Sequence, residues 1–457
     1  MEKMRDARSV VGEWVGHVAV RSPARLALGA FASVILLFTG LLSLPGATAS
    51  GERAPFIDAL FTATSAVCVT GLVTVDTGSY WSAWGLAIIA IGIKVGGLGI
   101  MTLASLVGLA VSKRLGLTQR LLAAGEARAT GLGDLRSLLR TVVVVSFSIE
   151  IVIALILLPR FLTLDYGVGR SIGYSSFYAV SAFNNAGFTP DPAGLYPYAD
   201  DFWMLVPIAL GVLIGSLGYP VYLNMVRGWR RPRMWSLHTK LTLITVGGLM
   251  LVSAGFLAIF EWSNPNTLGA ASTNETIGNI FFQSINQRSG GFASFDVGQA
   301  RETTWLLEIV LMFIGGGSGS TAGGIRVTTL AVLLLAIVAE ARGRRDMEAF
   351  GKRIGTEVLR GAVAITMIGV SVIVIGTAVF MAQTDITLDR ALYETVSAYA
   401  TCGLSTGVTA GLPPEAKGTL IVLMYVGRVG SLTIAAALAL SKQRRVIRYP
   451  GERPIIG

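Results

Sequence analysis

Charged side chains are scarce in this chain of 457 residues. Asp, Glu, Lys and Arg together make up 14% of it, whereas 53% of the residues are hydrophobic, and the mean hydropathy is +0.65. The polar surface is too small to cover a water-soluble globule of that length. The composition therefore predicts a membrane protein.

Cysteine and histidine occur only twice each, as Cys68, Cys402, His17 and His238. Their spacing is not that of a metal site, and both cysteines lie in short apolar segments where a structural disulfide is not expected. We interpret the two cysteines as small packing residues.

Apolar stretches of roughly 20 residues, the length that crosses a bilayer, recur along the chain. The first follows a charged segment, residues 1–25, and nothing after it resembles a cleavage site, so we expect a span rather than a signal peptide. We predict eight spans, near residues 26–46, 82–111, 141–159, 203–226, 239–260, 305–340 (interrupted), 359–382 and 418–440.

Basic residues are clustered between the spans. Of 37 Lys and Arg residues, 27 fall in five clusters, each after an even number of predicted spans: residues 3–25, 113–140, 227–240, 342–360 and 442–453. Basic loops face the cytoplasm, so both termini should be cytoplasmic in a plasma (inner) membrane protein. The net charge of +10 thus reflects topology and contact with anionic lipid, and it argues against a nucleic-acid partner.

One local pattern occurs four times. An aromatic residue stands ten positions before a glycine, and Leu or Phe follows that glycine: Phe61 to Gly71, Phe177 to Gly187, Phe281 to Gly291, and Tyr393 to Gly403. The glycines are 116, 104 and 112 residues apart, so one unit of about 110 residues is repeated through the chain.

Each unit reads as a span, a short apolar segment, a glycine turn and a second span. We therefore predict an all-α integral membrane protein with eight transmembrane helices, in four tandem helix–pore-loop–helix repeats around a pseudo-fourfold pore. After a cytoplasmic N-terminal segment, 1–25, the predicted repeats are 26–120, 121–235, 236–350 (with an intramembrane gating loop) and 351–457 (with a cytoplasmic tail).

The short segments are too short to cross the bilayer. In the first, a helix from Pro55 to about Ala66 would be roughly 18 Å long, about half the hydrocarbon thickness. The chain would then return as irregular backbone, which at that depth must be buried in protein or line water. Four such segments around one axis meet this condition together.

Glycine allows the backbone angles that turn carbonyl oxygens toward an axis. Such carbonyls replace the hydration shell of a cation, and the C-terminal ends of the short helices add negative potential. The alternative for any single glycine is close helix packing, but four in the same local frame favour a filter. The predicted filter residues are Val69, Thr70, Gly71, Asn185, Ala186, Gly187, Ser289, Gly290, Gly291, Thr401, Cys402 and Gly403.

Acidic residues follow three of the glycines: Asp76, Asp191 and Asp296. They would raise the cation concentration at an outer mouth. Ordinary turn residues are an equally good interpretation, and the fourth repeat lacks an acid there.

Ten consecutive small residues interrupt the sixth span, and they should break its helix into a flexible loop below the glycines. A movable gate is one interpretation and a static helix break is the other. The loop residues are Gly315, Gly316, Gly317, Ser318, Gly319, Ser320, Thr321, Ala322, Gly323 and Gly324.

Two basic residues fall within predicted spans, where a charge is costly and needs water or a partner. Arg428 should lie below the glycines near the loop, where it would repel a cation or tie the carbonyls of the broken helix together. The sequence does not indicate a role for Lys94.

Taken jointly, these features resemble the Trk/Ktr/HKT superfamily of potassium transport proteins, and most closely the Ktr membrane subunit (KtrB-type). The likeness covers essentially the whole chain: the four repeats, the motifs at the glycines (Thr70-Gly-Leu, Asn184-Asn-Ala-Gly-Phe, Gly290-Gly-Phe and Cys402-Gly-Leu), Gly96-Gly-Leu-Gly-Ile-Met-Thr-Leu, and the Gly/Ser-rich loop.

The resemblance implies K⁺ uptake, often Na⁺-dependent, with K⁺ held at the filter carbonyls. It also implies a homodimer with one pore per subunit and a cytosolic regulatory RCK-type (KtrA-like) ring that binds nucleotides. By the same likeness, residues 315–324 are the gate and Arg428 is its electrostatic companion. Gly71 stands where Na⁺-favouring plant relatives often have serine, which supports K⁺. Lys94 departs from the glutamine expected in many relatives.

Three other functions share part of this pattern. A Na⁺-conducting or weakly selective pore would share this architecture, because selectivity depends on fine carbonyl geometry. A solute carrier would show two inverted repeats instead of four parallel ones. Gly316-Gly-Ser-Gly resembles the nucleophile motif of an intramembrane serine protease, but neither His17 nor His238 falls within a membrane segment, so we do not expect an enzyme.

Overall fold

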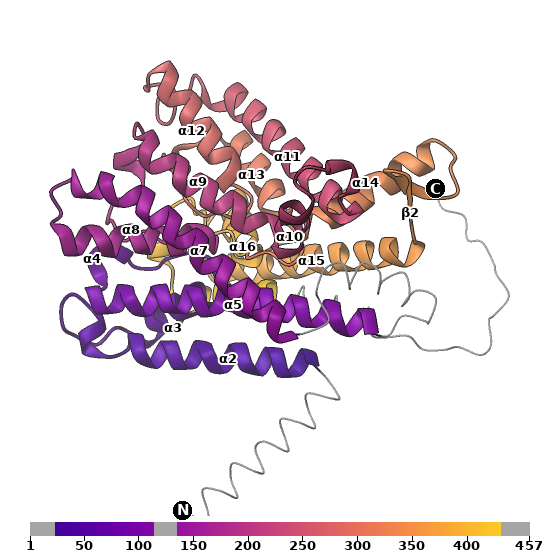
Figure 1. Ribbon diagram of the computed structural model, residues 1–457. Helices are drawn as coiled ribbons and strands as arrows, with labels where there is room; N and C mark the ends of the chain where they lie inside the picture. The colour runs from indigo at the N-terminus through magenta and orange to yellow at the C-terminus, as the bar shows by residue number, and fades with distance from the viewer. Residues whose placement is uncertain (1–22, 114–134, 431–457) are drawn as a thin grey trace, which may run out of the picture.

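The computed structural model describes residues 23–113 and 135–430, which are helical apart from loops and one short hairpin (Figure 1). Most of the predicted N-terminal segment, much of the second basic cluster, the end of the eighth predicted span and the C-terminal tail lie outside the described residues.

The same order of elements occurs four times in the described ranges. An apolar helix comes first: α2 (Pro23–Leu42), α7 (Leu135–Leu162), α11 (Leu237–Glu261) and α15 (Thr356–Ala382). A shorter helix follows and ends four or five residues before a repeated glycine: α3 (Phe56–Val67), α8 (Val168–Phe183), α12 (Thr273–Asn286) and α16 (Leu388–Tyr399).

A second apolar helix completes each unit. It is broken in the second and third units, and in the fourth it passes into a π-helical turn at the end of the described residues. These helices are α5 (Ala83–Lys113), α9 with α10 (Phe202–Leu217, Tyr219–Gly228), α13 with α14 (Glu302–Phe313, Val327–Ala341), and α17 (Pro414–Tyr425) with the π-helical turn η6 (Val426–Gly430). Short turns connect them: η1 (Pro45–Ala47), α4 (Thr77–Tyr80), η2 (Tyr196–Tyr198), η3 (Pro232–Met234), η4 (Val297–Gln299) and η5 (Thr409–Gly411).

Local sequence explains where the short helices begin. Pro55 stands immediately before α3 and is not its first residue, so the helix begins one residue later than predicted. It also ends one residue later, at Val67 instead of Ala66. In α12, Ser272 and Glu275 form a capping box that satisfies the free N–H groups of the first turn. The predicted half-length helix of the first unit is therefore confirmed to within a residue at each end.

Three helices of the described residues are long and apolar enough to cross a membrane: Arg140–Leu162, Leu237–Glu261 and Thr356–Ala382. The other expected spans are shorter, bent, broken or continue outside the described residues, so the number eight stays a prediction.

The span predicted near residues 203–226 is bent instead of straight. α9 and α10 meet at a bend of 97°. Gly218, between them, has φ +92°, and the N–H of Tyr219 donates to the carbonyl of Gly319 at 3.2 Å instead of continuing α9. Pro220 has no N–H to donate and favours a helix start.

The predicted interruption of the sixth span is confirmed, because α13 ends at Phe313 and α14 begins at Val327. The described part adds one hairpin to the helical fold, β1 (Met347–Ala349) antiparallel to β2 (Lys352–Ile354). Met347 and Ile354 pack on Ala339 of α14.

The helices bury polar residues and expose apolar ones, as lipid-facing proteins do. Thr62, Thr64 and Ser65 of α3 are buried, whereas Leu251 of α11 is 77% exposed and Ile375 of α15 is 64% exposed. Figure 1 shows α2, α3 and α5 side by side, with α7, α8 and α9 above them and α16 near the centre.

Candidate functional site

The four repeated glycines meet in the structure and form a closed ring, here called the glycine ring (Gly71, Gly187, Gly291 and Gly403). A Cβ atom built on each would lie under 3.0 Å from the backbone of the next segment, and the last segment returns to the first. The contacts run from Gly71 to Ala186, from Gly187 to Gly291, from Gly291 to Cys402 and from Gly403 to Thr70.

Backbone angles also require glycine at these positions. The φ angles are +93° at Gly71, +70° at Gly187, +71° at Gly291 and +99° at Gly403. Side chains larger than hydrogen are therefore excluded both by strain and by the neighbouring segment. The predicted meeting of the four segments is what the structure shows.

Three non-glycine residues near the ring are also left-handed. Val69, Asn185 and Thr401, each two positions before a ring glycine, have φ +55°, +60° and +47°. For the β-branched Val69 and Thr401 this conformation is strained, and such strain concentrates at functional sites. Ser289 of the third segment does not share it.

Serines six positions before a ring glycine support three segments. Ser65 Oγ accepts from the N–H of Gly71 at 3.0 Å, and Ser397 Oγ accepts from the N–H of Gly403 at 3.1 Å. Ser181 Oγ donates to the carbonyl of Phe188 at 2.8 Å. Sequence reasoning missed these residues, although their fixed distance from the glycines was visible.

Glycines of the second apolar helices pack on the ends of the short helices. A Cβ on Gly96, Gly215 or Gly427 would lie under 3.0 Å from a carbonyl carbon or oxygen, and the three contacts are with Val67, Phe183 and Tyr399. Each contacted residue stands four positions before a ring glycine. Close packing of the second apolar helices against the short helices therefore explains these glycines.

The glycine-rich loop, residues 315–324, lies against the ring segments. Thr321 Oγ1 donates to Asn185 Oδ1 at 2.9 Å, and the N–H of Gly323 donates to Ser289 Oγ at 3.3 Å. A Cβ on Gly323 would lie under 3.0 Å from the Ala400 carbonyl. The loop thus contacts the second, third and fourth segments directly.

Two arginines hold the loop, the buried Arg428 and the half-buried Arg326. Arg428 donates from Nη1 to the carbonyl of Thr321, as expected from its position. Within the described residues, its Nε and Nη2 have no hydrogen-bond partner. Arg326, which sequence reasoning missed, donates to the carbonyl of Ala322 at 2.5 Å. No carboxylate of the described residues pairs with the Arg428 guanidinium, so its charge stays uncompensated near the loop.

The three acidic residues after the ring act in local structure. Asp76 accepts from the N–H of Ser79, and Asp296 accepts from the N–H of Gly298, so both cap turns. Asp191 is buried and accepts from the hydroxyl of Tyr178 at 2.9 Å. Burial raises the pKa of the Asp191 carboxyl, an effect that this hydrogen bond partly offsets. These contacts favour the turn interpretation.

The contacts of Ser318 do not fit a protease nucleophile. Its hydroxyl lies 3.1 Å from the hydroxyl of Thr328, and His238 is at the start of α11. His17 lies outside the described residues. The two cysteines are free and buried, and Cys402 Sγ lies 3.4 Å from the carbonyl of Gln287.

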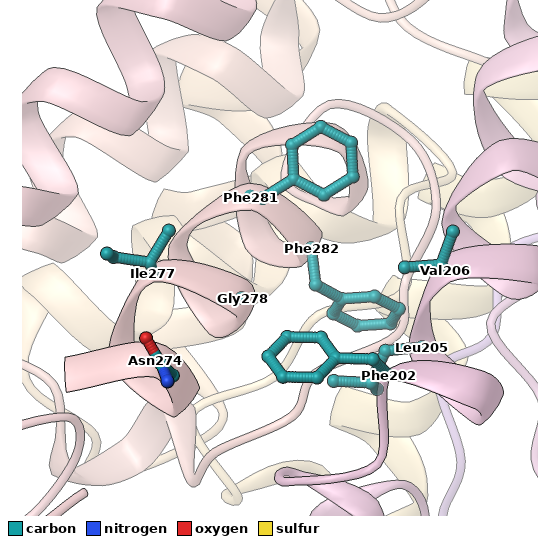
Figure 2. A pocket seen from close by; sticks show the side chains of 8 residues that line it. All are labelled: Phe202, Leu205, Val206, Asn274, Ile277, Gly278, Phe281 and Phe282. Atoms are coloured by element: carbon teal, nitrogen blue, oxygen red, sulfur yellow. The ribbon is translucent and has the colours of Figure 1, made fainter. Parts of the chain in front are cut away.

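A cavity of about 500 Å³ lies between α9 and α12, away from the ring. Figure 2 shows its lining, in which Phe202, Phe281 and Phe282 project from the two helices. No ring or loop residue lines it, and apart from Asn274 its walls are apolar. The cavity therefore gives no polar site for an ion.

Comparison with known proteins identifies the group to which this architecture is similar. Residues 32–448 match the TrkH family profile, described as a cation transport protein. The Ktr system potassium uptake protein B of Bacillus subtilis is 37% identical over 94% of this chain and 95% of its own length. The potassium/sodium uptake protein NtpJ of Enterococcus hirae is 33% identical over 95% of this chain and 97% of its own.

A solved structure has the same fold. The crystal structure of the potassium transporter TrkH from Vibrio parahaemolyticus superposes with a TM-score of 0.67 and covers 91% of this chain and 85% of its own, at 18% sequence identity.

Proposed function

Because the chain belongs to the TrkH family of cation transport proteins, we propose that it takes up K⁺ across the plasma membrane through a filter of backbone carbonyls. It is an all-α membrane protein and not an enzyme. The relatives named for potassium uptake match along nearly its whole length, which supports K⁺ as the transported ion.

The observation that carries the proposal is the closed glycine ring. The backbones of four segments with left-handed glycines contact one another in order, and this contact supports a ring of main-chain oxygens around one axis. These oxygens replace the water that a K⁺ ion sheds. The filter residues are the twelve predicted from the sequence, three in each segment.

We assign the glycine-rich loop and Arg428 to the gate. The loop contacts three of the four ring segments, so it obstructs the path of an ion leaving the ring. Arg428 holds the loop at Thr321 and places a positive charge beside it, which repels a cation. Movement of the loop opens the path.

The assembly follows the family resemblance. We propose a homodimer with one pore per subunit and a cytosolic nucleotide-binding ring on the face that carries the basic loops. Both termini are then cytoplasmic. The repeat boundaries at 26–120, 121–235, 236–350 and 351–457 belong to this same proposal.

A second candidate is a pore that also carries Na⁺. The name of the Enterococcus hirae relative, potassium/sodium uptake protein, favours it. Purified protein in liposomes separates the two functions: uptake of labelled Rb⁺ is measured with K⁺ or Na⁺ as competitor, with and without a cytosolic partner. K⁺ competing far better than Na⁺ supports a K⁺ filter, and equal competition supports the second candidate.

A further inference from the structure

A buried ion pair lies next to the second ring segment. Lys94 Nζ of α5 lies 2.6 Å from Glu150 Oε1 of α7, and 2.6 Å from the hydroxyl of Ser146. The side chains are 12% and 5% exposed. The Lys94 ammonium also lies 4.0 Å from the centre of the Phe147 ring. Lys94, whose role the sequence did not indicate, therefore contacts a carboxylate, a hydroxyl and an aromatic ring.

The same carboxylate oxygen is linked to the ring. Asn184 Nδ2 donates to Glu150 Oε1 at 2.9 Å and to the carbonyl of Val180 at 2.9 Å. Asn184 caps the C-terminal end of α8 and precedes the left-handed Asn185, whose own side chain accepts from Thr321 of the loop. The ion pair is thus linked to the filter segment by the Glu150–Asn184 hydrogen bond, and the filter segment is linked to the loop by the Asn185–Thr321 hydrogen bond.

Helix packing fixes these links in place. Gly97 of α5 approaches Asn184 so closely that a Cβ there would lie under 3.0 Å from its side chain. Gly96 beside it packs on the end of α3. One turn of α5 thus contacts the ends of two short helices, and Lys94 stands next to that turn.

We propose that Lys94 and Glu150 are positioning residues, which hold Asn184 and thereby set the spacing of the filter carbonyls at Asn185–Gly187. This inference rests on the proposed K⁺ filter. Asn185 is left-handed at φ +60°, a conformation that Asn tolerates, and the neighbours that fix Asn184 help to hold it there. Ion discrimination depends on carbonyl geometry, so loosening Asn184 should alter selectivity and not only folding.

The test measures the KM for Rb⁺ and the inhibition constant for Na⁺ in proteoliposomes, at equal amounts of folded protein. Glu150→Ala removes the acceptor of Asn184, and Asn184→Ala removes the donor while leaving the ion pair intact. Each should shift one or both constants by roughly fivefold or more, because small misplacements at a filter are costly. The Lys94→Gln/Glu150→Gln double variant should stay within about twofold of wild type, since an uncharged hydrogen-bonded pair replaces a buried ion pair at little cost.

The Asp58–Lys417 ion pair is a matched control. It joins α3 to α17 at 2.7 Å, and both of its side chains are 12% exposed. Lys417→Met should lower the yield or melting temperature and leave both constants near wild type. The inference is overturned if Asn184→Ala keeps wild-type constants, if the double variant behaves like Glu150→Ala, or if Lys417→Met shifts selectivity equally. Absence of selective uptake by the wild type would instead reject the proposed function itself.

Discussion

Gly403 lies directly against Thr70, although one residue comes from the last repeat and the other from the first. A Cβ atom on Gly403 would lie under 3.0 Å from the Thr70 carbonyl oxygen. This contact closes the ring, because the other three contacts each join consecutive segments. The first and the last repeat of the chain thereby meet at the glycine ring.

Gly403→Ala should abolish discrimination between K⁺ and Na⁺. The new methyl group would strike the Thr70 carbonyl, and the residue would carry a left-handed strain of about 1–2 kcal/mol. We expect Na⁺ to compete with Rb⁺ at least roughly tenfold better than in wild type.

Gly407→Ala is the matched control for that change. Gly407 has φ +89° but nothing within 4 Å of an added Cβ, so it carries the strain without the clash. Equal effects of the two substitutions on ion competition would show that strain, and not the ring contact, is responsible.

Ser397→Ala should loosen the fourth segment. It leaves the partly buried N–H of Gly403 without its acceptor, which costs about 1 kcal/mol. We expect a lower melting temperature in detergent together with weaker K⁺ preference. Ser371→Ala, which removes an exposed hydroxyl of α15 bonded within its own helix, should change neither. A wild-type melting temperature for Ser397→Ala would contradict the supporting role of this hydroxyl.

Deleting residues 317–322 should raise the rate of Rb⁺ uptake. The deletion removes Thr321 and its hydrogen bonds to Asn185 and Gly215, and with them the obstruction beside the ring. Size-exclusion chromatography checks that the variant is folded before flux is measured. A folded deletion variant with wild-type or lower flux would eliminate the gate assignment.

Substitutions at Arg428 separate its two roles. Gln keeps a donor for the Thr321 carbonyl but removes the charge, whereas Lys keeps the charge with fewer donors. If charge repels the ion, Arg428→Gln raises flux and Arg428→Lys stays near wild type. If Arg428→Lys raises flux and Arg428→Gln stays near wild type, Arg428 acts only through its hydrogen bond to the loop.

The sequence predicted the ring because its cause is local and repeated. Gly71, Gly187, Gly291 and Gly403 stand in one frame, and only glycine accepts the backbone angles needed there. The break in the sixth span was predictable for the same reason, since ten small residues cannot sustain an apolar helix. The roles of filter and gate stay predictions until ion flux is measured.

Other features depend on contacts that the sequence does not display. Lys94 could not be paired with Glu150, because the two lie on different helices of different repeats. The bend at Gly218 depends on the loop beside it, to which Tyr219 donates. Arg326 stands two positions after the glycine-rich run, but only the structure shows that it bonds back to the Ala322 carbonyl.

The most direct test of the account locates the ion. Crystals of the protein grown with Rb⁺ or Tl⁺ in place of K⁺ would reveal the bound ion by its anomalous scattering. We predict peaks on the axis between the carbonyl oxygens of the four ring segments, and their loss when Na⁺ replaces the heavier ion. Peaks found only beside carboxylates, or an axis without any peak under saturating ion, would contradict a filter made of main-chain oxygens.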